Sequence, residues 1–420
     1  MQTTAQQILE VKDIEDAYLR LKPVINHTPL LLNDYLSEKY ACKIYLKRED
    51  LQIARSYKLR GAYNKISRLP ANQLKTGIVC ASAGNHSQGV AYVCEKLKVK
   101  GIIFMPNPTP NQKIKKVKRF GKNFIEIVLV GDTFDDAYAA AQAYAVKHHV
   151  TFVHPFDDPL VMAGQGTVAY EILEDFKEEI DFLFAPIGGG GLCAGVGTYL
   201  KDLRPNIKII GAEPKGAPAM YNSINNKALT PLKEIDVFVD GAAVKNVGEF
   251  TFKVCSKVLD DVALVEEGKI CSTILDLYNE EAIVAEPAGV LSISVLDQYA
   301  EEIKGKNVIC ILSGGNNDIT RMEEIKERSL IYEGLKCYFI IRFPQRAGAL
   351  KEFLNEVLSE NEDIAHFEYT KKTNREKGPA LVGLELKHKG DYAALIDRME
   401  KHKINYQALN DNQELFEMLV

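Results

Sequence analysis

The eight cysteines of this 420-residue sequence form no C-x-x-C pair, and no histidine cluster stands beside them. That spacing argues against a structural zinc site, and scattered cysteines are typical of a reducing compartment. We therefore expect small thiols within the core and a cytoplasmic location.

The sequence also lacks an excess of basic charge and long apolar runs. Its net charge is −5 with both signs interspersed, which argues against nucleic acid or an anionic membrane as the main partner. The densest basic run, at 113–122, has apolar residues at helical spacing and predicts the solvated face of an amphipathic helix. Pro186 and a glycine run interrupt the most apolar window, so no membrane-spanning helix is expected. Residues 1–21 lack the basic start and apolar centre of an export signal.

Short β-branched runs alternate with helix-length segments as far as about residue 320. Several runs are apolar on both faces, which predicts parallel strands covered by helices on two sides. The runs lie at 43–49, 76–82, 101–106, 124–130, 151–154, 181–187, 207–213, 261–267 and 307–312. This order predicts an α/β fold with open, mostly parallel sheets. Because so long a segment exceeds one comfortable core, we expect two sheet lobes with a cleft between them.

The alternation stops after residue 320. Residues 321–335 predict a charged connector helix, and residues 336–420 follow the order β-α-β-β-α-β of a ferredoxin-like plan. This last segment contains no catalytic constellation, so a regulatory role is expected. A purely structural or dimerisation element is the alternative.

Four consecutive glycines at 188–191 connect an apolar strand to a helix of small residues. Glycine lets backbone N–H groups approach a ligand, and a helix N-terminus favours an anion, so the loop predicts a phosphate site. Leu192 and Cys193 stand where a Walker loop would carry lysine and a hydroxyl. The loop could instead bind a dinucleotide, with Glu213 as the acidic residue that contacts a ribose.

Two other predicted strands end in polar loops. The stretch "CASAGNHSQGVA" at 80–91 offers donors that suit a carboxylate, although Ser82 could instead cap the following helix. After the last strand, Ser313 is expected to project into the cleft. A neutral hydroxyl there can bond a ring nitrogen without protonating it.

Lys58, in "ARSYKLRGAY", is expected near a helix start, two residues after a candidate Ser56 cap. The helix N-terminus, Arg55 and Arg60 should lower the pKa of Lys58 and favour a neutral amine, which can form a Schiff base. A lone lysine is most often surface decoration. Together, however, the phosphate loop, the carboxylate loop, the hydroxyl and this lysine match the anchoring needs of pyridoxal 5′-phosphate.

Over about residues 5–320 the motifs resemble, in order, those of the fold-type II pyridoxal-phosphate enzymes and, within them, the serine/threonine dehydratases. The motifs are "SYKLRGAY", "SAGNHSQGVA", "HPFDDPLVMAGQGTVAYEIL", "GGGGL", "AEP", "AEPAG" and "SGGN". The tail "FIIRFPQRAGALKEFLNEVL" is similar to the single ACT-like domain of short-form biosynthetic threonine dehydratases (threonine ammonia-lyases). The resemblance implies a two-lobed catalytic domain at 1–320, the connector helix and an ACT-like regulatory domain at 336–420.

The resemblance also implies residue roles. Lys58 would hold the cofactor as a Schiff base, with Asn85 at its 3-oxygen and Ser313 at its pyridine nitrogen. The cofactor phosphate would be bound by Gly188, Gly189, Gly190, Gly191 and Leu192, and the substrate carboxylate by Ser82, Ala83, Gly84 and His86. No metal ligand is expected, because the residues after Glu213 lack the acidic partner that some relatives use for a divalent cation. Tyr57 stands where the family most often has Phe.

The implied reaction is β-elimination of water from L-threonine, with L-serine as a secondary substrate. It would give 2-oxobutanoate and ammonia at the first step of isoleucine biosynthesis. Isoleucine, with valine opposing it, would act at the C-terminal domain of a homodimer or homotetramer. The alternatives are a catabolic serine/threonine dehydratase or serine racemase regulated by a nucleotide, a nicotinamide oxidoreductase, and a non-catalytic amino-acid sensor.

Overall fold

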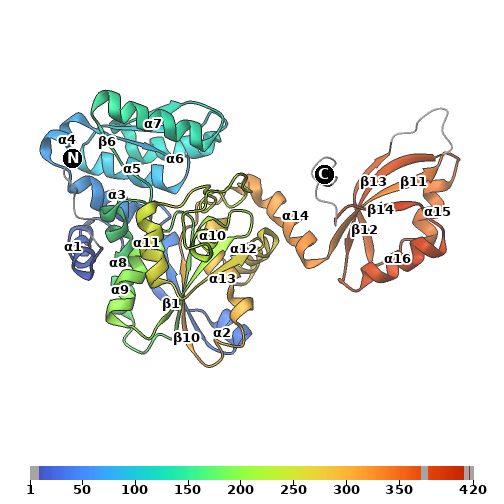
Figure 1. Ribbon diagram of the computed structural model, residues 1–420. Coiled ribbons are helices and arrows are strands. Elements are labelled where there is room, and N and C mark those ends of the chain that lie inside the picture. Colours follow the sequence, from blue (N-terminus) through green and yellow to red (C-terminus); the bar gives the residue numbers. More distant parts are fainter. Residues whose placement is uncertain (1–8, 370–376, 411–415, 417–420) are drawn as a thin grey trace. The chain divides into compact units, whose positions relative to one another are not determined.

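The computed structural model describes residues 9–369, 377–410 and 416, and it divides into two compact units (Figure 1). The first unit is Met1–Asp318 and the second is Ile319–Val420. The helix of the predicted connector is α14 (Met322–Glu333), and it lies within the second unit.

The first unit contains two sheets with helices around them (Figure 1). The larger sheet has the order β1-β2-β10-β7-β8-β9 and is parallel except for the β1–β2 pair. Its strands are β1 (Leu30–Leu32), β2 (Lys43–Arg48), β7 (Phe182–Pro186), β8 (Lys208–Pro214), β9 (Asp261–Val265) and β10 (Asn307–Leu312). The smaller sheet has the order β5-β4-β3-β6 and is parallel throughout. Its strands are β3 (Ile78–Ala81), β4 (Gly101–Met105), β5 (Ile125–Leu129) and β6 (Thr151–Phe152).

All nine predicted strands are therefore confirmed, and so is the two-sheet α/β architecture. The antiparallel edge strand β1 is additional. Its three residues are too few to show a periodic pattern, so nothing in the sequence distinguishes it from a loop.

The helices of the first unit alternate with these strands. They are α1 (Val11–Leu21), α2 (Asp34–Tyr40), α3 (Lys58–Ser67), α4 (Ala71–Thr76), α5 (Asn85–Leu97), α6 (Asn111–Gly121), α7 (Phe134–His148), α8 (Pro159–Asp175), α9 (Gly191–Leu203), α10 (Ala219–Asn225), α11 (Glu249–Val258), α12 (Glu267–Glu281) and α13 (Leu291–Ser294). Short 3₁₀ turns are η1 (Glu49–Leu51), η2 (Lys122–Phe124), η3 (Pro287–Val290), η4 (Leu296–Tyr299) and, in the second unit, η5 (Ile319–Arg321). The basic run at 113–122 falls mainly on α6, with Val117 buried beneath it as predicted.

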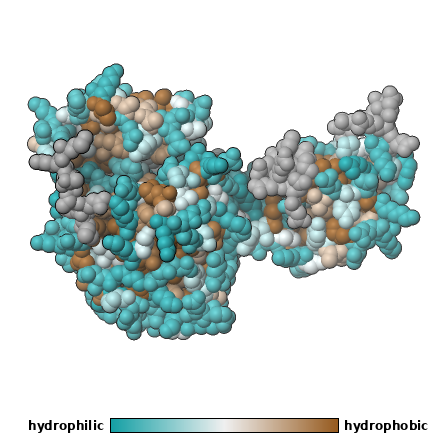
Figure 2. Space-filling view, viewed as in Figure 1, coloured by the Kyte–Doolittle hydropathy of each residue, from teal (hydrophilic) through white to brown (hydrophobic). Residues whose placement is uncertain are grey.

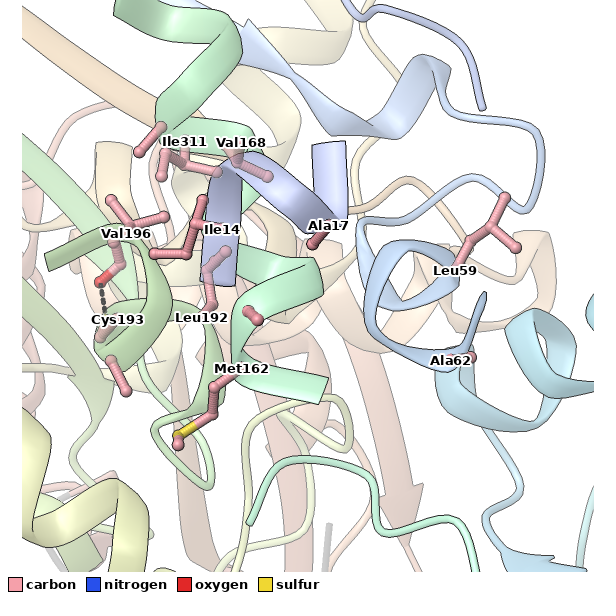
Figure 3. Packing of buried hydrophobic residues seen from close by; sticks show 14 of the residues in the cluster. Ile14, Ala17, Leu59, Ala62, Met162, Val168, Leu192, Cys193, Val196 and Ile311 are labelled. Carbon is pink, nitrogen blue, oxygen red and sulfur yellow. Dashed lines mark hydrogen bonds between the residues drawn. The ribbon is translucent and has the colours of Figure 1, made fainter. Parts of the chain in front are cut away.

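Helix α8 joins the parts that carry the candidate site, because it packs closely on both α3 and α9. A Cβ on Gly164 would lie 2.6 Å from the carbonyl oxygen of Arg60 in α3. A Cβ on Gly195 of α9 would lie 2.3 Å from the carbonyl oxygen of Met162 in α8. Figure 3 shows Met162 and Val168 of α8 in the same apolar cluster as α9 and α1 side chains. The starts of α3 and α9 are thereby held by one rigid core.

The second unit has a core of its own and the ferredoxin-like plan that the sequence predicts. Its antiparallel sheet has the order β12-β13-β11-β14. The strands are β11 (Lys336–Pro344), β12 (Glu362–Tyr369), β13 (Lys377–Leu386) and β14 (Tyr406–Ala408), and the helices packed with them are α15 (Ala349–Glu356) and α16 (Asp391–Lys401). Phe339, Val382 and Leu395 are fully buried in this core.

Polar residues cover most of the visible face of the molecule, with apolar side chains exposed in small groups (Figure 2). All eight cysteines are unpaired and buried, as predicted. No helix within the described residues is long and apolar enough to span a membrane.

Candidate active site

Three chain segments meet at one edge of the larger sheet. Strand β10 lies between β2 and β7, with Leu312 opposite Arg48 of β2. The three strands are parallel, so the segment that leads to Lys58, the glycine loop and Ser313 all leave the same edge. The chain before Lys58 then pairs with the chain after β10, since Ser56 bridges Gly314 and Tyr57 N donates to Ser313 O over 3.3 Å. The sheet order thus brings together residues that are about 130 and 255 positions from Lys58.

Lys58 is the first residue of α3, and its Nζ donates to the carbonyl oxygen of Pro155 over 3.1 Å. The Tyr57 ring lies beside it, with its centroid 5.3 Å from Nζ. Burial lowers the pKa of Lys58 from its ordinary 10.5 to about 8, against the opposing attraction of Glu286. The predicted direction of the pKa shift is therefore confirmed, and its cause is desolvation.

The two arginines next to Lys58 do not produce this shift, and that part of the sequence hypothesis is wrong. Arg55 is exposed. Arg60 is fully buried and its guanidinium is neutralised by Glu49 at 2.7 Å and Glu171 at 2.8 Å. Ser56 does not cap α3 either, because the N-cap residue is Tyr57 and the Ser56 hydroxyl has no partner among the described residues.

The glycine loop has the geometry of an anion site. Gly190 adopts φ +87°, which favours glycine, and it is the N-cap residue of α9. The first backbone bond of α9 runs from Ala194 N to Gly190 O, so the preceding N–H groups have no intrahelical acceptor. Among the described residues no side chain caps this end. A Cβ on Gly189 would lie 2.3 Å from the Phe156 ring, so the loop cannot carry a larger residue there.

The loop between β3 and α5 offers a second set of donors. The N-cap of α5 is Gly84 and not Ser82, whose Oγ instead accepts from Gly84 N over 3.1 Å. The first backbone bond of α5 runs from Gln88 N to Gly84 O. The N–H groups of Asn85 and His86 therefore precede it and have no acceptor within the helix.

The side chain of His86 points away from this donor set. Its Nε2 lies 3.0 Å from the carbonyl oxygen of Val153, which requires a hydrogen on Nε2. Its Nδ1 has no partner in the described part of the chain. Burial, and then the nearby charge of Lys58, lower the pKa of His86 to about 3. His86 is thus a neutral ring whose free nitrogen is an acceptor.

Glu286 and Asn316 lie in the motifs "AEPAG" and "SGGN", but the sequence alone does not identify them as residues of the site. Asn85 Nδ2 donates to Glu286 Oε1 over 2.5 Å, and Asn316 Nδ2 donates to Asn85 Oδ1 over 2.7 Å. Glu286 is 7% exposed. Burial and the nearby Asp240 raise the pKa of Glu286 to about 7, against the hydrogen bonds it receives. An acidic residue inside the apolar "AEPAGVL" stretch is the sequence signal that could have pointed to it.

Ser313 and Glu213 occupy different environments. Ser313 is buried, and its Oγ lies 3.4 Å from Ala288 O, so it has capacity for a stronger partner. Glu213 is also buried, but its carboxylate accepts the N–H groups of Met220 and Tyr221 at the start of α10. Burial raises the pKa of Glu213 to about 8. This carboxylate is already used in capping a helix, which does not favour a ribose or a cation as its ligand.

The donor set fits pyridoxal 5′-phosphate. The residues present are a lysine amine of lowered pKa, two helix starts with unsatisfied N–H groups, and a neutral hydroxyl on a buried strand end. Within the described residues, no group of three or more His, Cys, Asp or Glu side chains is arranged to hold a metal ion.

Comparison with known proteins agrees with this chemistry. Residues 21–314 match the family of pyridoxal-phosphate-dependent enzymes, and residues 327–419 match the C-terminal regulatory domain of threonine dehydratase. The chain is 58% identical to the biosynthetic L-threonine dehydratase IlvA of Bacillus subtilis (strain 168), over 98% of each chain. It is 57% identical to the protein of the same name from Halalkalibacterium halodurans, over 98% of this chain and 99% of the relative.

This chain belongs to the biosynthetic L-threonine dehydratase family. Among solved structures it is similar to the processed form of threonine deaminase isoform 2 from Solanum lycopersicum, with TM-score 0.73 and 39% identity. That likeness covers 76% of this chain and 93% of the tomato chain. Maize serine racemase is similar with TM-score 0.71 but only 27% identity, over 78% of this chain and 99% of the maize chain. The dehydratase interpretation is therefore favoured over the racemase alternative, and the nicotinamide interpretation of the glycine loop is wrong.

Proposed function

We propose that this chain deaminates L-threonine to 2-oxobutanoate and ammonia by pyridoxal-phosphate-dependent β-elimination of water, at the first step of isoleucine biosynthesis. The observation that carries the proposal is the identity of 57–58% over nearly the whole chain to proteins named biosynthetic L-threonine dehydratases. Support from the geometry is the meeting of Lys58, the glycine loop and Ser313 at one sheet edge.

We assign each anchoring residue a role that its surroundings support. Lys58 would hold the cofactor covalently through its amine, and the N–H groups of Gly188–Leu192 would bind the phosphate. Asn85 would contact the 3-oxygen. Ser313 would contact the ring nitrogen and leave it unprotonated, because a serine hydroxyl is too weak an acid to transfer its proton. When bound, the cofactor supplies a conjugated ring that takes up an electron pair from the substrate α-carbon.

Lys58 would also serve as the base that takes the α-proton of threonine. Its burial lowers the pKa to about 8, so about a tenth of the amine is neutral at pH 7, far more than for an ordinary lysine. A neutral amine can remove the α-proton of threonine. The loss of the β-hydroxyl as water then completes the elimination, and the product hydrolyses to 2-oxobutanoate and ammonia.

We assign the substrate carboxylate to the loop Ser82, Ala83 and Gly84 and to the start of α5. The backbone N–H groups of Asn85 and His86 have no acceptor within α5 and sit at the positive end of this helix. The His86 ring does not suit a carboxylate, because its free Nδ1 is an acceptor. His86 therefore contributes its backbone, and its ring keeps the loop packed against Val153.

The test is to load the purified protein with pyridoxal phosphate and to measure 2-oxobutanoate after adding L-threonine. L-Serine is the matched substrate, and we expect it to react more slowly. A loaded protein that forms no 2-oxo acid from either amino acid would overturn the proposal. Racemisation of L-serine without elimination would favour the racemase alternative.

Regulation is assigned to the second unit. It matches the regulatory domain of threonine dehydratase, and we propose that isoleucine binds there and inhibits, with valine opposing it. We also propose a homodimer or homotetramer in the cytoplasm, because ferredoxin-like modules commonly pair and all eight cysteines are free.

A truncation tests this regulation. Glu327 of α14 accepts from Lys336 Nζ at 2.5 Å and from Tyr338 OH at 2.6 Å, so α14 is bound to β11. The cut therefore belongs before Ile319, since a cut at residue 336 would leave α14 without its partners. We expect isoleucine to inhibit the full chain and not the truncated one. Isoleucine inhibition that survives the truncation would contradict the assignment.

A further inference from the structure

The amide of Asn85 is held from both sides. Its Nδ2 donates to Glu286 Oε1 over 2.5 Å, and its Oδ1 accepts from Asn316 Nδ2 over 2.7 Å. A reversed amide would set its nitrogen against the N–H donor of Asn316 and, whenever Glu286 is ionised, its oxygen against a carboxylate. The two partners therefore fix which atom is which. Because Nδ2 carries two hydrogens and Glu286 takes one, the second hydrogen has a fixed direction.

Asn316 is itself held in place. Its Nδ2 also donates to Ala54 O over 2.9 Å, so both hydrogens of that amide are used. Its backbone N donates to Glu286 Oε2 over 3.2 Å. Glu286 is thus bound through both oxygens, and a closed ring of hydrogen bonds joins the side chains of Asn85 and Glu286 to the side chain and the backbone N–H of Asn316.

The ring joins three separate parts of the first unit. Asn85 begins α5 beside the smaller sheet, Glu286 precedes η3, and Asn316 follows β10 of the larger sheet. Asn316 lies three residues after Ser313, on the segment that pairs with the chain before Lys58. A shift of Asn316 would therefore move the amide of Asn85 relative to Lys58.

We propose that Asn316 is a positioning residue which, together with Glu286, directs the second N–H of Asn85 at the 3-oxygen of the cofactor. The proposal rests on the proposed function, in which Asn85 faces that oxygen. A hydrogen bond of this kind stabilises the ionised form of the 3-oxygen. Loss of the Asn316 side chain frees the Asn85 amide to rotate, and this bond is then made only part of the time.

The first experiment uses Asn316→Ala in the full-length protein. We expect pyridoxal phosphate affinity to fall about tenfold, the scale of one hydrogen bond to a charged group. We also expect the visible spectrum of the loaded protein to shift from the band of the ionised 3-oxygen toward the shorter-wavelength band of its protonated form. An unchanged spectrum together with unchanged affinity would overturn the proposal.

A matched control separates positioning from stability. Asn307 stands at the other end of β10, and its Nδ2 donates to the carbonyl oxygen of Glu179 over 2.8 Å. Asn307→Ala removes one exposed side-chain bond far from the site, whereas Asn316→Ala removes two part-buried ones, so we expect a smaller change in melting temperature of the cofactor-free protein and no spectral shift. If Asn307→Ala shifts the spectrum equally, the effect of Asn316 is general and the proposal is wrong.

A double-mutant cycle tests whether Asn316 acts through Asn85. If it does, Asn85→Ala with Asn316→Ala should bind the cofactor as weakly as Asn85→Ala alone. Additive losses would show that Asn316 acts by another route and would overturn the proposal. The outcome also separates this proposal from the proposed function. If the unaltered protein takes up no pyridoxal phosphate, both fail, whereas normal uptake with additive losses refutes only the role of Asn316.

Discussion

The Lys58 amine donates to the carbonyl oxygen of Pro155, over 3.1 Å. The next residue, Phe156, packs under Gly189 and Gly191 of the glycine loop. One short segment therefore contacts both the amine that would hold the cofactor and the loop that would bind its phosphate. The distance between these two anchors is set by Pro155 and Phe156 and not by flexible side chains.

The pKa of Lys58 predicts how the cofactor-free protein should take up pyridoxal phosphate. Only the neutral amine reacts, so the rate of uptake should rise with pH, reach half of its maximum at about pH 8 and then level off. Stopped-flow absorbance at a series of pH values measures this rate. A rate that keeps rising toward pH 10.5 would indicate an ordinary lysine and contradict the account.

The same shift predicts a sign for stability. Between pH 8 and 10.5 the folded cofactor-free protein binds fewer protons at Lys58 than the unfolded chain does. The contribution of Lys58 to the free energy of unfolding should therefore rise between pH 8 and 10.5. Urea denaturation at a series of pH values measures this rise in the free energy of unfolding. The rise should be present in the unaltered protein and absent in Lys58→Met.

Gly190→Ala should weaken cofactor binding. The left-handed conformation at φ +87° costs a residue with a Cβ about 1–2 kcal/mol, and the new Cβ would lie 2.6 Å from Met220 Cε. Gly305→Ala is the control, because Gly305 has φ +71° and nothing within 4 Å of a Cβ. Both variants should lose about 1–2 kcal/mol of stability to backbone strain, with a larger loss in Gly190→Ala because of its close contact, but only Gly190→Ala should lose cofactor affinity. Equal affinities of the two variants for pyridoxal phosphate would show that the glycine loop does not bind the phosphate.

Ser313→Asp tests the contact at the ring nitrogen. A carboxylate there would accept a hydrogen bond from the protonated ring nitrogen and stabilise it, which favours a longer-lived delocalised charge, so we expect 2-oxobutanoate formation to fall. Ser313→Thr keeps the hydroxyl and should retain most of the turnover. Steady-state rates with L-threonine measure both, and unchanged turnover in Ser313→Asp would count against this role.

Arg60→Met should destabilise the fold without changing the pKa of Lys58. Arg60 is bound by Glu49 and Glu171, and its loss leaves Glu49 without the guanidinium while Glu171 keeps Lys47. Breaking a buried ion pair typically costs about 3–5 kcal/mol. Burial alone would raise the pKa of Glu171, whereas Arg60 and Lys47 lower it to about 2. The exposed pair Lys253–Glu249 is the control, and Lys253→Ala should cost below about 0.5 kcal/mol in urea denaturation. An uptake midpoint that rises in Arg60→Met would restore the arginine as the cause of the Lys58 shift.

Much of the fold is readable from the sequence because its strands are buried on both faces. Residues 308–312, for example, are all apolar, which suits a strand buried between two helical layers. The motif residues Lys58, Gly190 and Ser313 follow from the same pattern, since each stands where a strand ends or a helix starts. Their meeting at one sheet edge depends on strand order, which the sequence does not contain.

The contacts of side chains were harder to infer. Arg60 stands two residues from Lys58, and its charge suggests an effect on that amine. In the structure Arg60 is paired with Glu171, which is 111 residues away. Glu286 and Asn316 are missed for the same reason, because each depends on a partner from a distant segment. Local spacing identifies the residue types of the site, and the long-range pairs decide what those residues do.

The central claim is that Lys58 holds pyridoxal phosphate for the deamination of L-threonine. The most direct measurement is the visible spectrum of the loaded protein before and after L-threonine, with isoleucine added last, beside the same series on Lys58→Ala. We predict a visible band that changes on adding threonine while 2-oxobutanoate accumulates. Isoleucine should slow the formation of 2-oxobutanoate, and the band should be absent in Lys58→Ala. Borohydride reduction that attaches the cofactor to another lysine would contradict the account, as would turnover that survives in Lys58→Ala.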